Sequence, residues 1–256
     1  RENILKMATD VLSVSEKTPL RIPSYKDSDY PSVQCFDEKL LNLEEEELIR
    51  TGEGMMEVIR KNKPSITVTA EVGNSVSNIR LINTSGTDKS FKRSFYSISL
   101  CGTMVREDEQ LEIESSFSSG SYVDDVTPLA RKMVEDVTNS EKSVTIKSGP
   151  MPVIFSPRGF KTIYPPLYMA FCGDRVGRKV SPLADKHGEK IGPSFLTIVD
   201  DNTVPFGSLS GPMDDEGVPG ERTALVTDGI VKAFYYDLRN AEKYNTESTG
   251  NGIKRT

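Results

Sequence analysis

The stretch Gly211–Tyr236 constrains the fold more than any other part of the chain, because it contains a turn that few residue pairs permit. Thr223–Val226 and Ile230–Tyr236 are rich in residues typical of strands, and Asp228 and Gly229 lie between them. A two-residue type I′ turn requires positive φ at both central residues, and the pair Asp-Gly adopts such angles readily. The stretch therefore predicts a β-hairpin.

An acidic loop stands directly before this hairpin, among several glycines and prolines. Its three adjacent carboxylates repel one another unless solvent, a cation or backbone N–H groups take up the charge. Two interpretations stay open, a capped structural turn and a loop that binds substrate. The candidate residues for either role are Asp214, Asp215, Glu216, Gly217, Arg222 and Thr223.

The composition excludes several classes of protein. With 36% hydrophobic and 27% charged residues, the 256-residue chain is typical of a globular protein of one large or two ordinary domains. Its net charge of -6 argues against direct binding of nucleic acid. No apolar run approaches the roughly 20 residues that span a bilayer, and no signal peptide opens the chain, so we expect a cytoplasmic protein without a membrane partner.

The three cysteines, Cys35, Cys101 and Cys172, are odd in number and widely spaced. They include no CxxC pair, so neither a disulfide framework nor a thiolate metal site is indicated. We expect reduced thiols that pack as small hydrophobic side chains.

Apolar residues at helical spacing predict three long helices, over Arg1–Ser15, Glu44–Lys61 and Val126–Val137. The third has the clearest pattern, and either Asp124 or Asp125 is suited to cap it. Its apolar stripe should cover one face of a sheet.

Between the second and third helices the hydrophobic period changes to two, as in strands. We expect strands at Ser65–Val72, Ser77–Asn83, Ser94–Val105 and Gln110–Phe117, with a break at Gly73 and Asn74. Short connections between successive strands favour an antiparallel sheet. The serines of Ser115–Ser121 have no histidine or lysine nearby to activate a nucleophile, and we expect a flexible loop there.

A linker at Ser148–Pro152 suggests two domains. Residues 1–148 would form an N-terminal α+β domain that is incomplete at its start, and residues 149–256 would begin a β-rich C-terminal domain that is truncated. A short buried strand is expected at Pro152–Ser156, and a short apolar helix at Pro165–Gly173. The predicted fold class is α+β, a mostly antiparallel sheet with flanking helices followed by the start of a second β-rich domain.

Four ordered sequence motifs in the second half resemble a known family. They are SPLADKHGEKIGP at Ser181–Pro193, LTIVDD at Leu196–Asp201, DDEGVPGERT, which begins at Asp214, and STGNG at Ser248–Gly252. In this order they resemble the TldD/TldE family, whose TldE branch is also called PmbA and which was named as a modulator of DNA gyrase. Members of the family extend further at both ends, which suggests that this chain, without an initiator methionine, is a fragment.

The resemblance also implies where a metal site would lie. In the metal-bearing TldD branch a helix carries H-E-x-x-x-H, whose imidazoles bind a divalent metal while the carboxylate acts as general base on its water. Counting back from Gly188 places these positions at Tyr164, Pro165 and Met169. Tyrosine is a poor zinc ligand, proline has no side-chain base, and a thioether is too soft for a hydrolytic site.

His187 is the only histidine of the sequence. A site with two histidines therefore cannot form from these residues, and we predict no catalytic and no metal-binding residue in this chain. We expect His187 to be a surface imidazole, and nothing in the sequence places it next to Cys172 as a catalytic dyad.

The vacant metal positions make the chain resemble the TldE/PmbA branch. The resemblance implies a non-metal subunit of a TldD/TldE-type metallopeptidase complex that degrades or matures unfolded peptides. No cofactor is expected in this chain, and a divalent metal, zinc, is expected in the TldD-type partner; a homo-oligomer stays open. The alternative is a non-proteolytic regulatory protein that binds DNA gyrase or a toxin–antitoxin component. A third hypothesis is hydrolysis by this chain alone, through Cys172 or the acidic loop.

Overall fold

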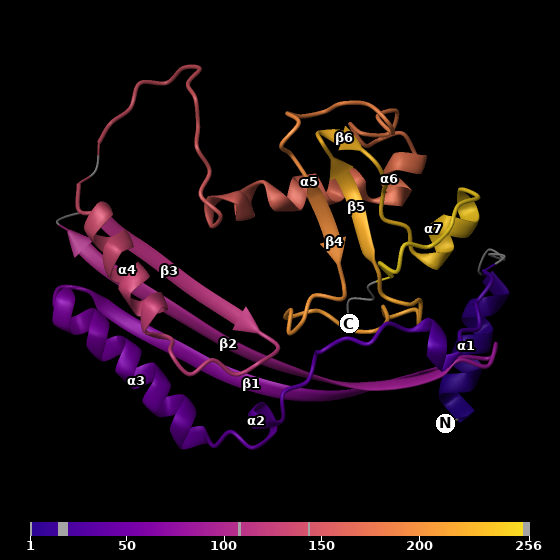
Figure 1. Ribbon diagram of the computed structural model, residues 1–256, viewed down its shortest axis with the longest axis horizontal. Coiled ribbons are helices and arrows are strands. Elements are labelled where there is room, and N and C mark those ends of the chain that lie inside the picture. Colours follow the sequence, from indigo (N-terminus) through magenta and orange to yellow (C-terminus); the bar gives the residue numbers. More distant parts are fainter. Residues whose placement is uncertain (1, 15–19, 107–108, 143, 253–256) are drawn as a thin grey trace.

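The computed structural model describes residues 2–14, 20–106, 109–142 and 144–252. Within these ranges it contains two three-stranded antiparallel sheets and flanking helices, which confirms the α+β class (Figure 1). The elements are α1 (Glu2–Val14), η1 (Asp27–Asp29), α2 (Glu38–Leu41), α3 (Glu45–Asn62), β1 (Thr67–Ile82), β2 (Asp88–Arg106), β3 (Glu109–Ser119), α4 (Thr127–Asn139), η2 (Gly159–Thr162), α5 (Tyr164–Phe171), α6 (Gly173–Gly177), β4 (Ile198–Asp201), β5 (Arg222–Thr227), β6 (Ile230–Val231) and α7 (Leu238–Lys243).

The first sheet has the order β1-β2-β3, and α3 and α4 cover one of its faces (Figure 1). Apolar side chains alternate along the strands and meet the apolar stripes of both helices. Ile59, Tyr96, Leu100 and Met133 are 0% exposed at the centre of this core. The helices expected at Glu44–Lys61 and Val126–Val137 are thus confirmed as α3 and α4.

The predicted break at Gly73 and Asn74 is wrong, because β1 runs without interruption to Ile82. The long partner strand β2 continues the ladder along this whole length, from Thr67↔Thr103 to Ile82↔Asp88. The Asn74 side chain, instead of ending the strand, donates a hydrogen bond from Nδ2 to the Leu40 carbonyl at 2.7 Å.

The flexible loop expected at Ser115–Ser121 is also wrong over most of its length. The first five of these serine-rich positions belong to β3 and pair with β2. Serine hydroxyls on the strand alternate between the core face, where Ser115 is buried, and the opposite face. Pairing with β2 therefore overrides the local preference of serine for turns.

The expected cap of α4 by Asp124 or Asp125 is also wrong. The residue at the N-cap is Val126, with no side-chain cap. Asp125 Oδ1 instead accepts from the Thr127 N–H at 3.0 Å, and Asp124 forms an ion pair with Lys39 at 2.8 Å.

The strand expected at Pro152–Ser156 is wrong as well. The segment lies in an arch that projects away from both sheets (Figure 1), and Ile154 is 97% exposed. Among the described strands, none pairs with this apolar run.

The second sheet has the order β4-β5-β6 and packs on α5 and α6 through Phe171, Leu225 and Val231. The type I′ hairpin is confirmed, with φ of 53° at Asp228 and 77° at Gly229. The strand expected to continue to Tyr236 ends at Val231. The Lys232 N–H still donates to the Leu225 carbonyl of β5 at 2.8 Å. The chain then pairs with the end of α5, where the Tyr235 N–H donates to the Phe171 carbonyl at 2.9 Å.

The C-terminal region, residues 149–252, lies against the half of the β1–β2 hairpin that contains its turn, where Gly217 approaches Leu81 and Gly211 approaches Phe91. Backbone hydrogen bonds join the two regions, from Gly120 N to Phe206 O at 2.7 Å and from Phe206 N to Gln34 O at 2.6 Å. The Tyr30 hydroxyl donates to the Gly217 carbonyl at 2.9 Å. A side chain on Gly120 would lie 3.1 Å from the Phe206 backbone, so glycine permits this close approach. The domain boundary at residue 148 stays a prediction.

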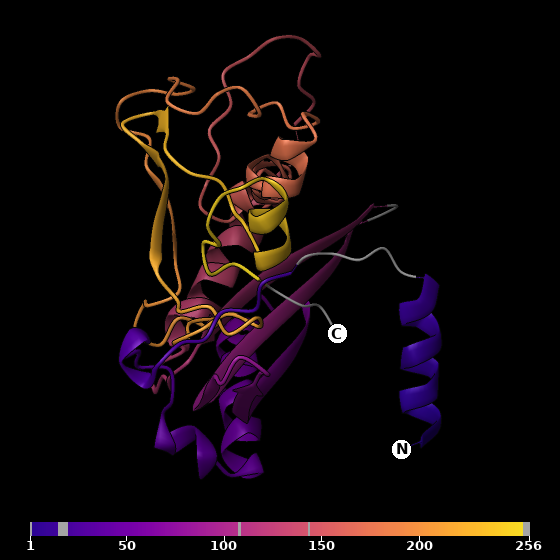
Figure 2. The same ribbon diagram turned by 90° about the vertical axis from the view of Figure 1, so that its right-hand side faces the viewer.

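Figure 2 shows α1 standing apart from both sheets. The helix expected at Arg1–Ser15 is present as Glu2–Val14, while Arg1 and Ser15 lie outside the described residues. Ile4 and Met7 are 71% and 69% exposed. Among the described helices, none has the length and apolar character required to cross a bilayer.

Candidate functional site

A cleft of ≈ 460 Å³ lies between the C-terminal region and the open face of the first sheet. We call it the α5 cleft, because Tyr164 and Tyr168 of α5 form one side of it. Arg93 of β2 lines it from the sheet, and the acidic loop and the residues after β4 complete it. The cleft therefore brings together segments that are far apart in the sequence.

The helix α5 begins with two prolines in its first turn, where the missing N–H groups cost nothing. It presents an aromatic wall: the ring centroids of Tyr164 and Tyr168 are 6.2 Å apart, and those of Tyr168 and Tyr235 are 5.2 Å apart. Burial raises the pKa of Tyr235, and the nearby Asp200 carboxylate adds to that rise. The Tyr235 phenol therefore keeps its proton.

The three positions that match the family's metal motif all lie on α5. Tyr164 is 54% exposed and lines the cleft, Met169 is 38% exposed, and Pro165 is exposed in the first turn. A phenol, a pyrrolidine ring and a thioether do not form a set of ligands for a hydrolytic divalent metal. The residues present at these positions thus do not fit the metal that the family's motif implies.

Asp214 of the acidic loop is held by three backbone N–H groups. Its Oδ1 accepts from Glu216 and Val218, both at 2.9 Å, and its Oδ2 accepts from Gly252 at 2.7 Å. Burial raises the pKa of Asp214, although these three hydrogen bonds act in the opposite direction. The Asp215 N–H in turn donates to the Gly252 carbonyl at 3.0 Å, so the loop and the STGNG motif are joined from both sides.

Four of the candidate residues, Glu216, Gly217, Arg222 and Thr223, do not line the cleft. Glu216 Oε2 accepts from the Leu238 N–H at 2.7 Å, at the start of α7. Gly217 has φ of 81°. Arg222 Nε lies 3.8 Å from Asp201 Oδ2 on the surface, and Thr223 is 7% exposed within β5. Of the six candidates, Asp214 and Asp215 line the cleft.

Several residues of the cleft are not predicted from the sequence. Asp200 and Asp201 end β4, and the Asn251 Nδ2 donates to Asp200 Oδ2 at 2.6 Å. Hydrogen bonds from the Thr203 hydroxyl and N–H lower the pKa of Asp201. A signal existed for Asp200 and Asp201, since two acids at the end of a short apolar run mark that end as polar. Nothing local in the sequence marks Arg93.

Neither His187 nor Cys172 forms part of this cleft. His187 is exposed, and its Nε2 lies 3.0 Å from the Lys232 carbonyl oxygen. Burial raises the pKa of the Cys172 thiol, which is the opposite of what a thiolate nucleophile requires. Within the part of the chain that the structure describes, no group of three or more His, Cys, Asp and Glu side chains is arranged to hold a metal.

An aromatic wall, carboxylates and one guanidinium line the α5 cleft and can contact a polar chain. Fold and site thus define an α+β protein with a polar, aromatic-lined cleft. Residues 38–141 match the model of the PmbA/TldA metallopeptidase central domain, and residues 148–256 match that of the PmbA/TldA metallopeptidase C-terminal domain. The chain belongs to the PmbA/TldD metallopeptidase family.

Individual relatives agree with this assignment. The chain is 28% identical to an uncharacterized protein of Methanocaldococcus jannaschii, over 86% of this chain and 51% of that protein. It is 29% identical to the metalloprotease PmbA of Escherichia coli O157:H7, over 66% of this chain and 38% of that protein. The chain thus spans about half the length, or less, of these relatives.

The solved structure of TldE from Thermococcus kodakarensis has the same fold. It superposes with a TM-score of 0.87 at 24% identity and covers 98% of this chain and 57% of the TldE chain. A putative modulator of DNA gyrase from Bacteroides thetaiotaomicron superposes with a TM-score of 0.85 at 22% identity, over 98% of this chain and 59% of that one.

Proposed function

We propose that this chain is the TldE/PmbA-like, non-metal subunit of a TldD/TldE-type metallopeptidase complex that degrades or matures unfolded peptides. The observation that carries the proposal is α5, where Tyr164, Pro165 and Met169 replace a metal-binding set beside an intact cleft. A chain of this family that keeps the cleft and lacks the ligands is suited to hold substrate while a partner supplies the metal.

In this role the residues of the α5 cleft bind and orient peptide. Tyr164 and Tyr168 offer ring faces and hydroxyls, and Arg93 offers a charged donor for carboxylate or carbonyl oxygens. Asp214 keeps the acidic loop in place through its three backbone hydrogen bonds. No bond-breaking step is assigned to this chain, and the divalent metal, zinc, would be held by the TldD-type partner.

Reconstitution of the full-length chain with a TldD-type partner tests the proposal. We expect a stable assembly at micromolar concentration that cleaves reduced, carboxymethylated α-lactalbumin and loses this activity when a chelator is added. Elemental analysis should find zinc on the partner and none on this chain alone. A partner without its metal-binding histidines is the control, since it should assemble but not cleave.

Other outcomes would overturn the proposal. Failure of the two chains to associate, or tightly bound zinc and peptide cleavage by this chain in isolation, would contradict the role of non-metal subunit. Chain-only activity that survives chelation and disappears in Cys172→Ala or Asp215→Asn would show independent hydrolysis.

The regulatory alternative is supported only by the names of two solved structures, which are described as putative modulators of DNA gyrase. Both are 22% identical to this chain, and at that identity they show the fold alone. Protection of the peptide without cleavage in the reconstituted pair would favour it.

A further inference from the structure

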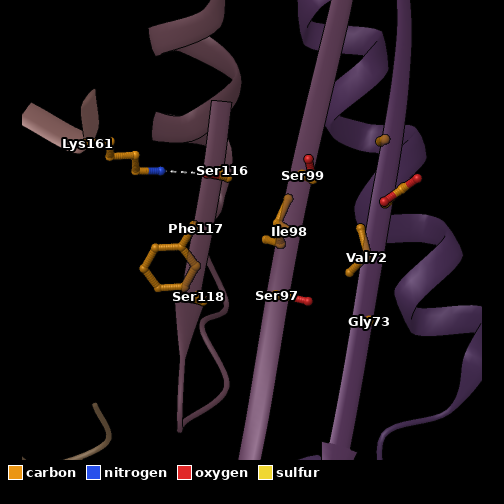
Figure 3. Close-up of a pocket in the computed structure, with 11 residues that line it drawn as sticks. Val72, Gly73, Ser97, Ile98, Ser99, Ser116, Phe117, Ser118 and Lys161 are labelled. Atoms are coloured by element: carbon orange, nitrogen blue, oxygen red, sulfur yellow. Dashed lines mark hydrogen bonds between the residues drawn. The ribbon is translucent and has the colours of Figure 1, made fainter. Parts of the chain in front are cut away.

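A second depression, of ≈ 660 Å³, lies on the face of the first sheet that α3 and α4 leave open (Figure 3). Four serines form its floor, Ser97 and Ser99 from β2 and Ser116 and Ser118 from β3. Lys161, which belongs to η2, reaches over one edge (Figure 3). We call this depression the serine groove.

The strand register explains the array of hydroxyls. Ser97 pairs with Ser118 and Ser99 pairs with Ser116, so four small side chains lie side by side on one face. Gly73 of β1, opposite Ser97, adds no side chain and deepens the floor. Small residues in two adjacent rows of a sheet leave room above the strands, which accounts for the volume of the groove.

The hydroxyls are available to a ligand. Ser116 Oγ accepts from Lys161 Nζ at 3.3 Å, while Ser97, Ser99 and Ser118 make no side-chain hydrogen bond to any described residue. Each hydroxyl can both donate and accept. An extended peptide offers alternating N–H and C=O groups along its length, so a row of hydroxyls can satisfy its main chain whatever its sequence.

The two sides of the groove carry opposite charges. Glu71 of β1 pairs with Ser99, so a carboxylate stands on the β1 side and the Lys161 ammonium on the β3 side. Neighbouring strands are about 4.8 Å apart, which places these opposite charges across two strand spacings. The Lys161 ammonium suits a peptide carboxylate, and Glu71 on the other side repels one.

The serine groove and the α5 cleft share the open face of β2. Arg93, Ser97 and Ser99 are separated by even numbers of residues, so their side chains lie on the same face of the strand. Six residues from Ser99 to Arg93 correspond to about 20 Å of strand, which an extended peptide of about six residues would span. Beyond Arg93 this face is closed by the C-terminal region, where Phe91 lies against Gly211.

We propose that the serine groove and the open face of β2 form a track for an extended, unstructured peptide. Its C-terminal carboxylate pairs with Lys161, its main chain bonds to the serine hydroxyls, and its upstream residues reach Arg93 in the α5 cleft. This inference rests on the proposed role in handling unfolded peptides and adds to it a path, a direction and the residues that set both.

The test measures binding of a fluorescein-labelled, unstructured twelve-residue peptide to the full-length chain by fluorescence anisotropy, with and without the TldD-type partner. Ser99→Phe fills the groove and should weaken binding by about tenfold or more, the effect of losing about 1.4 kcal/mol. Thr67→Phe is the matched control, since Thr67 lies on β1 near the same face but outside the groove. It should bind like the unmodified chain.

A charge reversal tests the direction. Lys161→Glu should weaken binding of the peptide with a free C-terminal carboxylate and leave the C-terminal amide of the same peptide little affected. Lys142→Glu, at another exposed lysine, is the control. Because Lys161 is exposed, this variant should fold even if Ser99→Phe does not; thermal unfolding by circular dichroism checks both.

The result that overturns the track is binding by folded Ser99→Phe and Lys161→Glu within about twofold of the unmodified chain, or no binding by the unmodified chain. If the unmodified pair still cleaves peptide in that case, the track is wrong while the proposed subunit role stands. If peptide binds to the groove but the pair neither assembles nor cleaves, the subunit role is wrong and the track stands.

Discussion

The helix-covered sheet and the C-terminal region are stabilised in different ways. In the sheet, long strands bury apolar side chains against α3 and α4, and Ile59, Tyr96 and Met133 are 0% exposed. In the C-terminal region the strands β4, β5 and β6 contain 4, 6 and 2 residues. The long loops between them depend on hydrogen bonds from side chains to the backbone, with Asp214 as the clearest example.

Because of this difference, the two regions should tolerate substitutions to different degrees. An apolar core distributes its stability over many contacts, each of them replaceable by a similar hydrophobic side chain. A buried carboxylate that satisfies several backbone N–H groups has no substitute of equal geometry. The α5 cleft is built from the second kind of structure, so its shape should be more sensitive to single polar substitutions than the sheet is.

The largest effect is expected in the apolar core, for Ile59→Ala. Ile59 is fully buried in α3, and removing three carbon atoms there leaves a cavity that the packed sheet cannot fill. We expect the free energy of unfolding to fall by about 3–4 kcal/mol, measured by urea denaturation. Ile49→Ala on the same helix is the control, because Ile49 is 51% exposed and its loss should cost under about 0.5 kcal/mol.

The matching test in the C-terminal region is Asp214→Ala. It leaves the N–H groups of Glu216, Val218 and Gly252 without their acceptor, and we expect a loss of about 2–3 kcal/mol in the free energy of unfolding. Asp185→Ala, whose side chain is 81% exposed, should change stability little. Equal stability of both variants would show that the acidic loop is not held by its carboxylate and would remove the contrast between the two regions.

The same contrast explains what the sequence could predict. The periodic apolar residues of α3 and α4 predicted helices at nearly their observed positions, because the pattern reports burial directly. The alternation in β2 predicted a strand from Ser94, although β2 begins at Asp88. The pair Asp228 and Gly229 predicted its turn because only unusual backbone angles suit it. Errors arose where pairing with a distant strand overrode a local signal, as at Gly73 and Asn74 in β1.

The α5 cleft was harder to predict, because its residues come from separate parts of the chain. The sequence singled out Tyr164 and the acidic loop by their resemblance to family motifs. It gave no sign that Arg93, in the middle of a strand, faces them across a cleft, because that contact depends on how the C-terminal region lies on the hairpin. The serine groove is a similar case, since the strand register that aligns its hydroxyls is a non-local property.

The pH dependence of stability sharpens the comparison further. Because burial raises the pKa of Asp214 in the folded state, its stabilising contribution is largest below its unfolded pKa and declines as pH rises through the folded pKa. The difference in free energy of unfolding between the unmodified chain and Asp214→Asn should therefore shrink as pH rises from below the unfolded pKa. For one proton, this difference cannot change by more than about 1.4 kcal/mol per pH unit. For the control Ile59→Ala, the difference from the unmodified chain should not change with pH.

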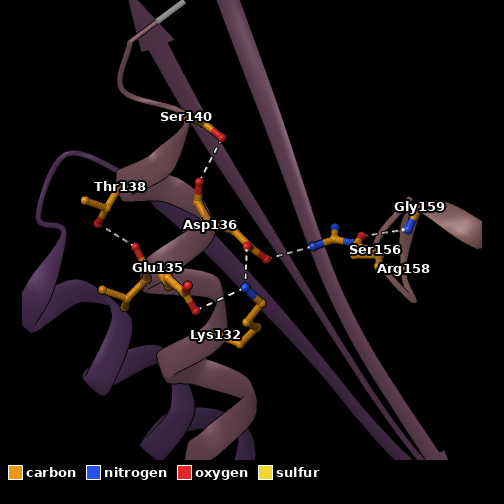
Figure 4. A network of polar contacts seen from close by, with 9 residues as sticks. Lys132, Glu135, Asp136, Thr138, Ser140, Ser156, Arg158 and Gly159 are labelled. Carbon is orange, nitrogen blue, oxygen red and sulfur yellow. Dashed lines mark hydrogen bonds and ion pairs between the residues drawn. The ribbon is translucent and has the colours of Figure 1, made fainter. Parts of the chain in front are cut away.

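The smallest effect is expected for Arg158→Ala, at the contact where the exposed arch returns to the first sheet. Figure 4 shows Arg158 reaching toward Asp136 of α4, which Lys132 also approaches; both nitrogen–oxygen distances are 3.0 Å. The Arg158 side chain is 47% exposed, so solvent and salt weaken the pair, and Lys132 remains to neutralise Asp136 after the substitution. We expect a loss below about 1 kcal/mol at low ionic strength that vanishes near 1 M salt, where charges are screened within about 3 Å. A loss that persists in high salt would instead mean that the arginine stem packs against α4, and the arch would then share the apolar stabilisation of the sheet.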